Sequence, residues 1–202
     1  MKDEIHDIIS RANQIKYGSD IQTILGFLTG GQESGSMVKT DKHFKKEETK
    51  RLINFIESNN LWVSNIDLNN YISEGAEQKV FLQNGKTVFK LNDAIYYTSW
   101  VDYFHNLLLN NYFFPDTAYH LLGFFENESV LFAVVEQAYI KATEKTDLSH
   151  VKQFMINNGF ENVRNNDFFN RELGLILEDL HDENVLTQNG VLFFIDTVFY
   201  IV

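Results

Sequence analysis

The stretch LEDLHDENVLTQNGVLFFIDTVF, residues 177–199, joins a polar loop to a β-hairpin and decides most of what the sequence says about fold. Apolar runs flank Gln188-Asn189-Gly190, and Asn-Gly favours the positive φ angles of a tight type I′ turn. A hairpin returns its second strand beside its first. We therefore expect Asn184, just before the hairpin, and Asp196, just after it, to lie close together.

The polar residues of this stretch are those that phosphoryl transfer from a nucleotide needs. Asp179 and Asn184 are five residues apart, and Asp196 follows twelve residues after Asn184. In such chemistry an amide and a carboxylate hold Mg²⁺, and a second carboxylate orients and deprotonates the attacking hydroxyl. A lysine neutralises the phosphates, so the stretch predicts a phosphotransferase site that still lacks its lysine.

A second Asn-Gly hairpin lies upstream and supplies a candidate lysine. Residues 79–82 and 87–91, which are rich in apolar side chains, lie on either side of Gln83-Asn84-Gly85-Lys86, and the return strand ends near Lys90. A turn at residues 73–78 leads into this hairpin. Lys90 taken alone is more simply a solvated charge at a strand end, and only the other motifs favour a function for it.

The remaining periodicity predicts an α+β chain. The first sixty residues have the apolar spacing of helices, interrupted by a polar connection at residues 32–41. Further along we expect helices and one more antiparallel pair of strands, at residues 96–111 (helix), 121–125 and 130–135 (strands), 148–157 (helix) and 168–176 (helix). The domains expected are an N-terminal helical extension, residues 1–62, and a main domain, residues 63–202.

Composition excludes several classes of protein. The chain has no Cys, so it has no disulfide framework, thiolate zinc site or cysteine nucleophile. With 17 Lys and Arg against 28 Asp and Glu, the net charge of −11 repels nucleic acid and anionic membranes. No apolar run is long enough to span a membrane, and no signal peptide is evident, so we expect a cytoplasmic protein.

One basic cluster stands against this acidic background, and we interpret it as the solvated face of a helix. Its lysines and arginine are interleaved with Glu47 and Glu48, which weakens any attraction for phosphates. The members are Lys42, Lys45, Lys46, Lys50 and Arg51. Neither a nucleic acid nor a membrane is expected as a partner.

At these motifs the chain resembles the protein-kinase-like superfamily, which includes the aminoglycoside phosphotransferases. The catalytic loop of those enzymes also places Leu-His after its aspartate and Asn five residues after it. More narrowly, the chain is similar to the small serine/threonine/tyrosine kinase-like domains found in polyvalent proteins of phages and conjugative elements. The segments that carry this resemblance are EGAEQKVFL (74–82), VVEQAYI (134–140), ILEDLHDENVL (176–186) and FIDTVF (194–199).

The resemblance implies a protein-kinase-like fold, with a strand-rich nucleotide lobe, a reduced helical lobe and the N-terminal extension. It implies ATP and Mg²⁺ as cofactors. Asp179 would be the catalytic base, Lys90 the phosphate-binding lysine, and Asn184 and Asp196 the metal ligands. The nucleotide-binding residues implied are a phosphate-covering loop, Gly75, Ala76, Glu77, Gln78 and Lys79, and a hinge, Glu136, Gln137 and Ala138.

The sequence also departs from the family pattern. The phosphate loop has one glycine where protein kinases have three, and Thr197-Val198 follows Asp196 in place of Phe-Gly. Leu177 stands where the phosphotransferases have a histidine. The helix after Lys90 has no obvious glutamate, and Asp102 is its nearest acidic candidate.

Three functions remain open. The first is an ATP- and Mg²⁺-dependent phosphotransferase from a mobile element, acting on an unknown hydroxyl of a protein or a small molecule. The second is a pseudokinase that binds nucleotide weakly or not at all and acts as a protein-interaction module. The third is a structural component of a mobile-element particle, in which the polar set is incidental.

Overall fold

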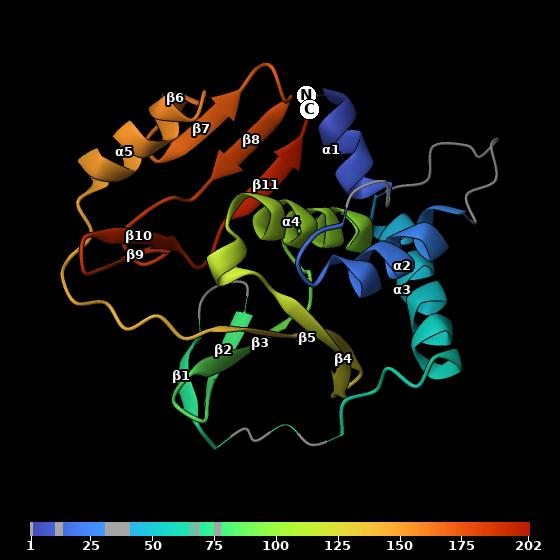
Figure 1. Cartoon of the computed structure of the whole chain (residues 1–202). Coiled ribbons are helices and arrows are strands. Elements are labelled where there is room, and N and C mark those ends of the chain that lie inside the picture. The colour runs from blue at the N-terminus through green and yellow to red at the C-terminus, as the bar shows by residue number, and fades with distance from the viewer. Residues whose placement is uncertain (1, 11–13, 31–40, 65, 67–68, 75–77) are drawn as a thin grey trace.

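The computed structural model describes residues 2–10, 14–30, 41–64, 66, 69–74 and 78–202, and its architecture is α+β (Figure 1). α4 lies between a five-stranded sheet and a four-stranded sheet. The helices are α1 (Lys2–Ile9), α2 (Gly18–Gly30), α3 (Asp41–Ser58), α4 (Trp100–Phe113) and α5 (Leu148–Asn157), with a 3₁₀ turn η1 (Pro115–Thr117). None of the helices described is long and apolar enough to cross a membrane.

The five-stranded antiparallel sheet has the order β1-β2-β3-β5-β4. It confirms the hairpin predicted around Gly85, because Asn84 (φ 41°) and Gly85 (φ 71°) both have the positive φ of a type I′ turn. The predicted pair around Asn127 is also present. The strands are β1 (Tyr71–Glu74), β2 (Gln78–Gln83), β3 (Thr87–Asn92), β4 (His120–Asn127) and β5 (Val130–Ala138).

The C-terminal region holds more strand than helix, in contrast to the helical lobe expected from the family resemblance. Its second Asn-Gly hairpin is as predicted, with Asn189 at φ 51° and Gly190 at φ 77°. A separate four-stranded antiparallel sheet has the order β11-β8-β7-β6. The strands are β6 (Glu161–Arg164), β7 (Asp167–Asn170), β8 (Leu175–Glu178), β9 (Val185–Gln188), β10 (Val191–Phe194) and β11 (Val198–Ile201).

The helix predicted at residues 168–176 is wrong, because this segment forms β7, a turn and the start of β8. The Asn170 side chain accepts a hydrogen bond from the Leu173 amide, and Gly174 has a φ of 65°, so the chain reverses here. Phe168 then pairs across the sheet with Leu177, and both side chains are buried. Pairing with β8 overrides the helical spacing of the apolar residues.

Other predicted elements differ at their ends. The first helix stops at Ile9, although apolar spacing continues to Ile15, and α4 begins at Trp100 where a start near residue 96 was predicted. Ser99 determines that start, because its hydroxyl accepts a hydrogen bond from the Asp102 amide. The predicted connection at residues 32–41 lies outside the described residues, except for Asp41, which begins α3.

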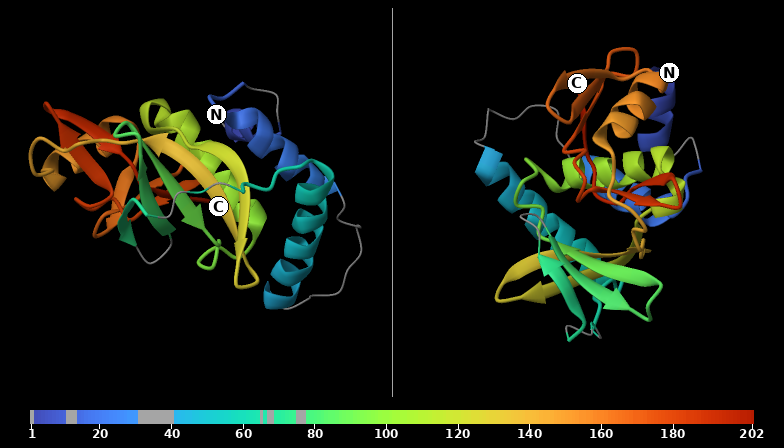
Figure 2. Two further views of the ribbon diagram at one scale, coloured as in Figure 1. Left: turned by 90° about the horizontal axis from the view of Figure 1, so that it is seen from below. Right: turned by 90° about the vertical axis from the view of Figure 1, so that its left-hand side faces the viewer.

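The N-terminal helices pack against the body of the molecule. α1, α2 and α3 all contact α4, and both views in Figure 2 show the three helices on the same part of the molecule as α4. Ile8, Ile21 and Leu52 are fully buried in one core with Trp100 and Phe104 of α4. Burial of their apolar stripes holds these helices in place, and the division at residue 62 stays a prediction.

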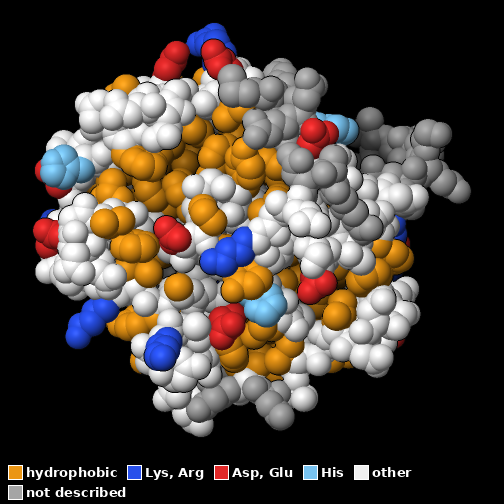
Figure 3. All heavy atoms as spheres, viewed as in Figure 1, with side chains coloured by type: hydrophobic (Ala, Val, Ile, Leu, Met, Phe, Trp, Pro, Cys, Tyr) orange, Lys and Arg blue, Asp and Glu red, His pale blue; other side chains and the backbone are white. Residues whose placement is uncertain are grey.

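The basic cluster on α3 is not wholly solvated. Lys45 is half-buried, and its ammonium donates to the carbonyl oxygens of Ala94 and Tyr97 (2.8 Å for the latter). The interpretation as a solvated face is therefore wrong for Lys45, because two carbonyls before α4 lie within its reach. On the face drawn in Figure 3, Lys and Arg side chains do not gather into one patch, whereas hydrophobic side chains do gather.

Candidate functional site

A cavity of about 410 Å³ lies where the five-stranded sheet meets the β9–β10 hairpin. Its volume is in the range typical of small-molecule sites, roughly 300–1,000 Å³. Residues from both sides line it: Ile72, Gln78, Val80, Val88, Lys90, Gln137, Ala138, Tyr139, Ile140, Glu183, Asn184, Leu186, Ile195 and Asp196. It brings together residues from the two hairpins that the sequence had singled out.

Strand geometry explains which side chains of the sheet reach the cavity. Gln78 and Val80 are two residues apart on β2, and Val88 and Lys90 are two residues apart on β3. Val80 pairs directly with Lys90. Residues two apart on a strand, and residues opposite each other across a pair, share a face. Leu186 of β9 and Ile195 line the cavity from the hairpin, so its apolar walls suit a flat ring.

Lys90 is buried, lines the cavity and is hydrogen-bonded to the segment that carries Asp196. Its Nζ atom donates to the Ile195 carbonyl oxygen (2.7 Å) and lies 5.3 Å from the centre of the Tyr119 ring. The Tyr119 hydroxyl donates to the same carbonyl (3.0 Å). Burial lowers the pKa of Lys90, and the negative charge of Asp196 acts in the opposite direction.

The charge of Asp102 in α4 acts on other groups than Lys90. Its charge influences Lys45, Glu48 and His105, whereas the charge that influences Lys90 is that of Asp196. The carboxylate whose charge acts on Lys90 is therefore that of Asp196, in the β10–β11 connection, and not one in the helix after β3.

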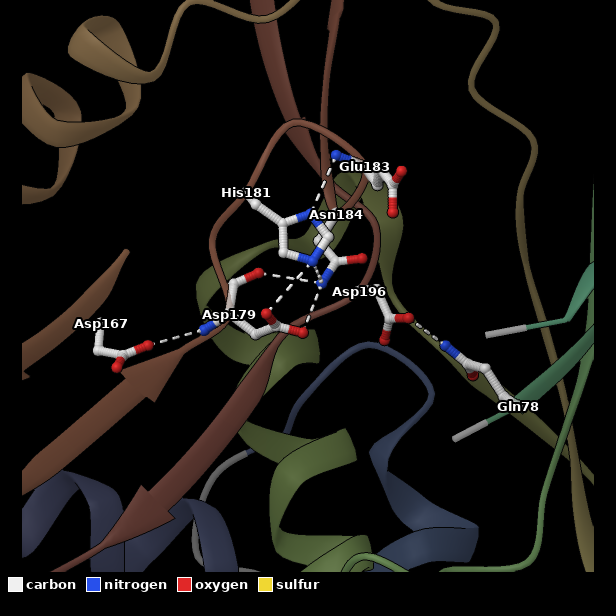
Figure 4. A network of polar contacts seen from close by, with 7 residues as sticks. All are labelled: Gln78, Asp167, Asp179, His181, Glu183, Asn184 and Asp196. Atoms are coloured by element: carbon white, nitrogen blue, oxygen red, sulfur yellow. Dashed lines mark hydrogen bonds and ion pairs between the residues drawn. The ribbon is translucent and has the colours of Figure 1, made fainter. Parts of the chain in front are cut away.

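The hairpin places Asn184 and Asp196 side by side. The backbone amides of Ile195 and Asp196 both donate to the backbone carbonyl oxygen of Asn184 (2.9 and 3.3 Å). The Asp196 carboxylate also accepts a hydrogen bond from the Gln78 side chain (2.5 Å), which joins the start of β2 to the hairpin across the cavity (Figure 4).

Asp179 is bound to Asn184 and His181 in one polar network (Figure 4). The Asn184 amide nitrogen donates to the Asp179 carbonyl oxygen (3.0 Å) and to its carboxylate (2.9 Å). His181 Nδ1 accepts from the Glu183 amide, so the neutral ring carries its proton on Nε2, 3.2 Å from the other Asp179 carboxylate oxygen. The Asp179 side chain is 57% exposed, so an incoming hydroxyl can reach it.

Asp167 is a part of this network that sequence reasoning missed. Its carboxylate accepts a hydrogen bond from the Asp179 backbone amide (3.2 Å), and Asp179 has a left-handed φ of 68°. Asp167 begins β7, directly before the segment for which a helix was predicted. No local signal could have found it, because its role depends on β7 lying beside the loop.

Two of the three predicted hinge residues line the cavity, and Glu136 does not. Gln137 and Ala138 line the cavity, and Tyr139 and Ile140, which directly follow them, were missed. The Glu136 carboxylate instead accepts from the Thr87 hydroxyl (3.0 Å) and lies 3.8 Å from His120. Gln137 is buried, and its amide donates to the Thr117 carbonyl (2.7 Å).

The phosphate-covering loop lies mostly outside what the structure describes. Gly75, Ala76 and Glu77 are outside the described residues, whereas Gln78 lines the cavity. Lys79 points to the other face of β2, with its ammonium 5.9 Å from the centre of the Phe132 ring. Of the loop residues that are described, Gln78 is therefore the one at the cavity.

The donor atoms at the cavity fit a magnesium–nucleotide complex. The side-chain nitrogen of Asn184 donates to Asp179, and the side-chain oxygen of Asn184 lies on the side of Asp196 (Figure 4). Mg²⁺ is usually held by one or two carboxylates together with substrate phosphates. Among the described residues no group of three His, Cys, Asp or Glu forms a metal cage, so phosphates and water would complete the coordination.

The grouping of a buried lysine, a loop aspartate, an asparagine and a second aspartate resembles the set that kinase-like proteins use. A family model described as a serine/threonine/tyrosine kinase found in polyvalent proteins matches residues 45–202, and the chain belongs to this family. The match begins within α3 and includes all of the cavity. No curated protein and no solved structure matches the chain.

Proposed function

We propose that this chain is a phosphotransferase of protein-kinase-like fold, in a mobile-element protein, that uses ATP and Mg²⁺ to phosphorylate a hydroxyl of a protein or small molecule. One observation carries the proposal: Lys90, Asn184 and Asp196 line a single cavity, and Asn184 is hydrogen-bonded to Asp179. The family membership supports the same reaction class.

The adenine ring would occupy the slot between Val80 and Val88 on one side and Leu186 on the other. Tyr139 donates its backbone amide to Lys86 of the β2–β3 turn. In an extended chain the N–H and C=O groups of successive residues point to alternate edges, so those of Ala138 and Ile140 would point away from β3. We assign the adenine edge to these two residues of the cavity wall.

The phosphates would lie toward Lys90, beside Gln78 at the start of β2. The Lys90 ammonium would neutralise their charge, and Asp196 and Asn184 would hold Mg²⁺ through a carboxylate and an amide oxygen. Bound Mg²⁺ would stabilise the charge that develops on the phosphates. Asn184 can act on two partners at once, because its side-chain nitrogen holds Asp179 while its side-chain oxygen remains available to Mg²⁺.

Asp179 would act as the general base. The acceptor hydroxyl oxygen attacks the γ-phosphorus, the bond from that phosphorus to the β–γ bridging oxygen breaks, and ADP leaves with the electron pair. The hydroxyl proton passes to the Asp179 carboxylate. Asn184 and the Nε2–H group of His181 orient that carboxylate, one at each oxygen.

One contact favours the alternative, a pseudokinase that acts through protein contacts. The Gln78 amide donates to the same Asp196 carboxylate that would bind Mg²⁺. A protein that kept this contact when nucleotide was present would hold Mg²⁺ weakly. The active protein must exchange the Gln78 contact for the metal, so Mg²⁺-dependent binding separates the two functions.

Thermal-shift titration with ATP, with and without Mg²⁺, is the first test. A ligand that binds only the folded state adds about 2.7 kcal/mol of stability at a hundredfold excess over its dissociation constant. We expect a clear shift that requires Mg²⁺. A shift of the same size without Mg²⁺ supports a pseudokinase that binds nucleotide. No shift under either condition refutes the phosphotransferase and agrees with a pseudokinase that does not bind nucleotide.

Two variants test the division of roles. Asp196→Asn should abolish the Mg²⁺-dependent part of ATP binding. Asp179→Asn should leave that binding nearly intact and lower ATP hydrolysis or acceptor phosphorylation by roughly 10²- to 10⁴-fold, the usual contribution of a general base. Equal loss of binding in both variants would contradict the assigned roles.

A further inference from the structure

The segment between β10 and β11 carries Asp196, and buried side chains bond to several of its polar groups and to those of its neighbours. Thr117 donates its hydroxyl to the Phe194 carbonyl (2.5 Å), and Lys90 and Tyr119 share the Ile195 carbonyl. Beyond Asp196, the next contacts come from α4. The backbone around the candidate metal ligand is therefore fixed from both ends.

Two asparagines of α4 make the contacts beyond Asp196. The Asn110 side-chain oxygen accepts a hydrogen bond from the Thr197 hydroxyl (2.8 Å), and the Asn106 oxygen accepts one from the Phe199 amide (2.8 Å). The two asparagines are four residues apart, so they lie on one face of the helix. Asn110 and Thr197 are almost completely buried.

At both Asn106 and Asn110 the side-chain amide accepts one hydrogen bond and donates another. Asn110 accepts from Thr197 with its oxygen and donates to the Thr117 carbonyl with its nitrogen (3.3 Å), and Asn106 likewise donates to the Tyr97 hydroxyl (2.9 Å). A carboxylate could accept but not donate, and it would add buried negative charge near Asp196. Neutral amides thus join α4 to the segment that bears the charge.

We propose that Asn110, acting through Thr197, is a positioning residue for Asp196 and determines how strongly the nucleotide site responds to Mg²⁺. The proposal rests on the function proposed above. Its physical reason is that Thr197 directly follows Asp196, so the Asn110–Thr197 hydrogen bond restricts the backbone from which the carboxylate projects. Partners that orient a metal ligand typically change metal affinity or activity by about 10- to 100-fold when they are removed.

Thr197→Val tests the proposal, because it removes the hydroxyl and keeps the shape of the side chain. Thr146→Val is the matched control: Thr146 is also buried, and its hydroxyl bonds only to that of Thr187 among the contacts described, away from Asp196. Thr197→Ser keeps a hydroxyl and should behave like the unmodified protein. If Thr197→Val does not fold, Thr197→Ala removes the same hydroxyl without added bulk.

The first measurement needs no nucleotide. Amide hydrogen exchange of the free protein should become at least about tenfold faster at Ile195 and Asp196 in Thr197→Val, and should stay unchanged there in Thr146→Val. Unchanged exchange in Thr197→Val would overturn the positioning role. Faster exchange supports it even if the unmodified protein shows no response to ATP, a result that would refute only the proposed function.

The second measurement is the Mg²⁺ concentration that gives half of the ATP-induced thermal shift. We expect Thr197→Val to raise it about 10- to 100-fold and Thr197→Ser to restore it. Binding of ATP without Mg²⁺ should be the same in all variants. An equal Mg²⁺ requirement in Thr197→Val and Thr146→Val would overturn the proposal, because loss of a buried hydroxyl bond elsewhere would then have the same effect.

Discussion

At the scale of single residues, Asp179 shows how a strained backbone is held at the site. Its φ of 68° lies in the left-handed region, which L-residues other than Gly, Asn and Asp seldom adopt. Such conformations persist where the surroundings hold them in place. Here Asp167 accepts from the Asp179 amide and Asn184 donates to its carbonyl, so both of its own backbone polar groups have partners.

Replacing Asp167 with Ala should therefore impair catalysis without removing a group that touches substrate. We expect turnover to fall by roughly 10- to 100-fold, the cost of a displaced catalytic group, with ATP binding nearly unchanged. Asp167→Asn keeps an acceptor oxygen for the Asp179 amide and should retain most of the turnover. Steady-state kinetics of ATP hydrolysis checks both variants, and equal losses in the two would show that the charge of Asp167 matters and not its hydrogen bond.

At the scale of elements, the start of α4 is anchored by a helix far away in the sequence. Glu48 of α3 is buried, and its carboxylate accepts hydrogen bonds from the backbone amides of Trp100 and Val101 (2.6 and 3.3 Å). These are first-turn amides that a helix cannot satisfy itself. Negative charge is also favourable at a helix N-terminus, so α3 helps to fix the helix that carries Asn106 and Asn110.

The ionisation of Glu48 predicts a dependence of stability on pH. Burial is the largest cause that raises the pKa of Glu48, and its two backbone hydrogen bonds oppose it. Because the folded state then binds the proton more tightly than the unfolded state, the contribution of Glu48 to the free energy of unfolding is largest below pH ~4.5 and declines as pH rises through the raised pKa.

Glu48→Gln should lack this decline. Denaturant unfolding at several pH values from 4 to 8 measures it: the free energy of unfolding of the unmodified protein minus that of the variant should fall as pH rises. Glu47→Gln is the control, since the Glu47 side chain is exposed in an ion pair with Lys50. A difference that rises with pH would mean that hydrogen bonding, and not burial, dominates at Glu48.

At the scale of the whole molecule, the N-terminal helices are tied to the five-stranded sheet by the segment after α3. The Phe124 amide donates to the Leu61 carbonyl (2.9 Å), and the Val63 amide donates to the Phe124 carbonyl (2.8 Å). This close approach depends on Gly123, whose φ is 142°. A Cβ atom there would lie 2.3 Å from the Leu61 carbonyl oxygen.

Gly123→Ala should therefore destabilise the protein strongly. Overpacking against backbone and the unsuitable φ together predict a loss of about 2–5 kcal/mol in the free energy of unfolding, measured by denaturant titration. Gly85→Ala is the matched control: its φ is also positive, but a Cβ there would meet nothing within 4 Å, so only about 1–2 kcal/mol should be lost. Similar losses in both variants would show that residues 61–63 move away at little cost.

Features that depend on neighbours in the chain could be predicted from the sequence. Both Asn-Gly turns, α2 and its end near Gly30, and the approach of Asn184 to Asp196 across their hairpin follow from local backbone geometry. Family motifs pointed to Lys90 and Asp179 in the same way. These predictions needed no knowledge of how distant segments pack.

Tertiary structure alone decided the contacts that complete the site. Lys90 meets the Ile195 carbonyl across 105 residues of sequence, and Gln78 meets Asp196 across 118. Asp167 reaches Asp179 only because β7 and β8 pair, where apolar spacing had predicted a helix. The physical reason is that turn chemistry is set by a few adjacent residues, whereas strand partners and buried polar contacts depend on which distant surfaces exclude water together.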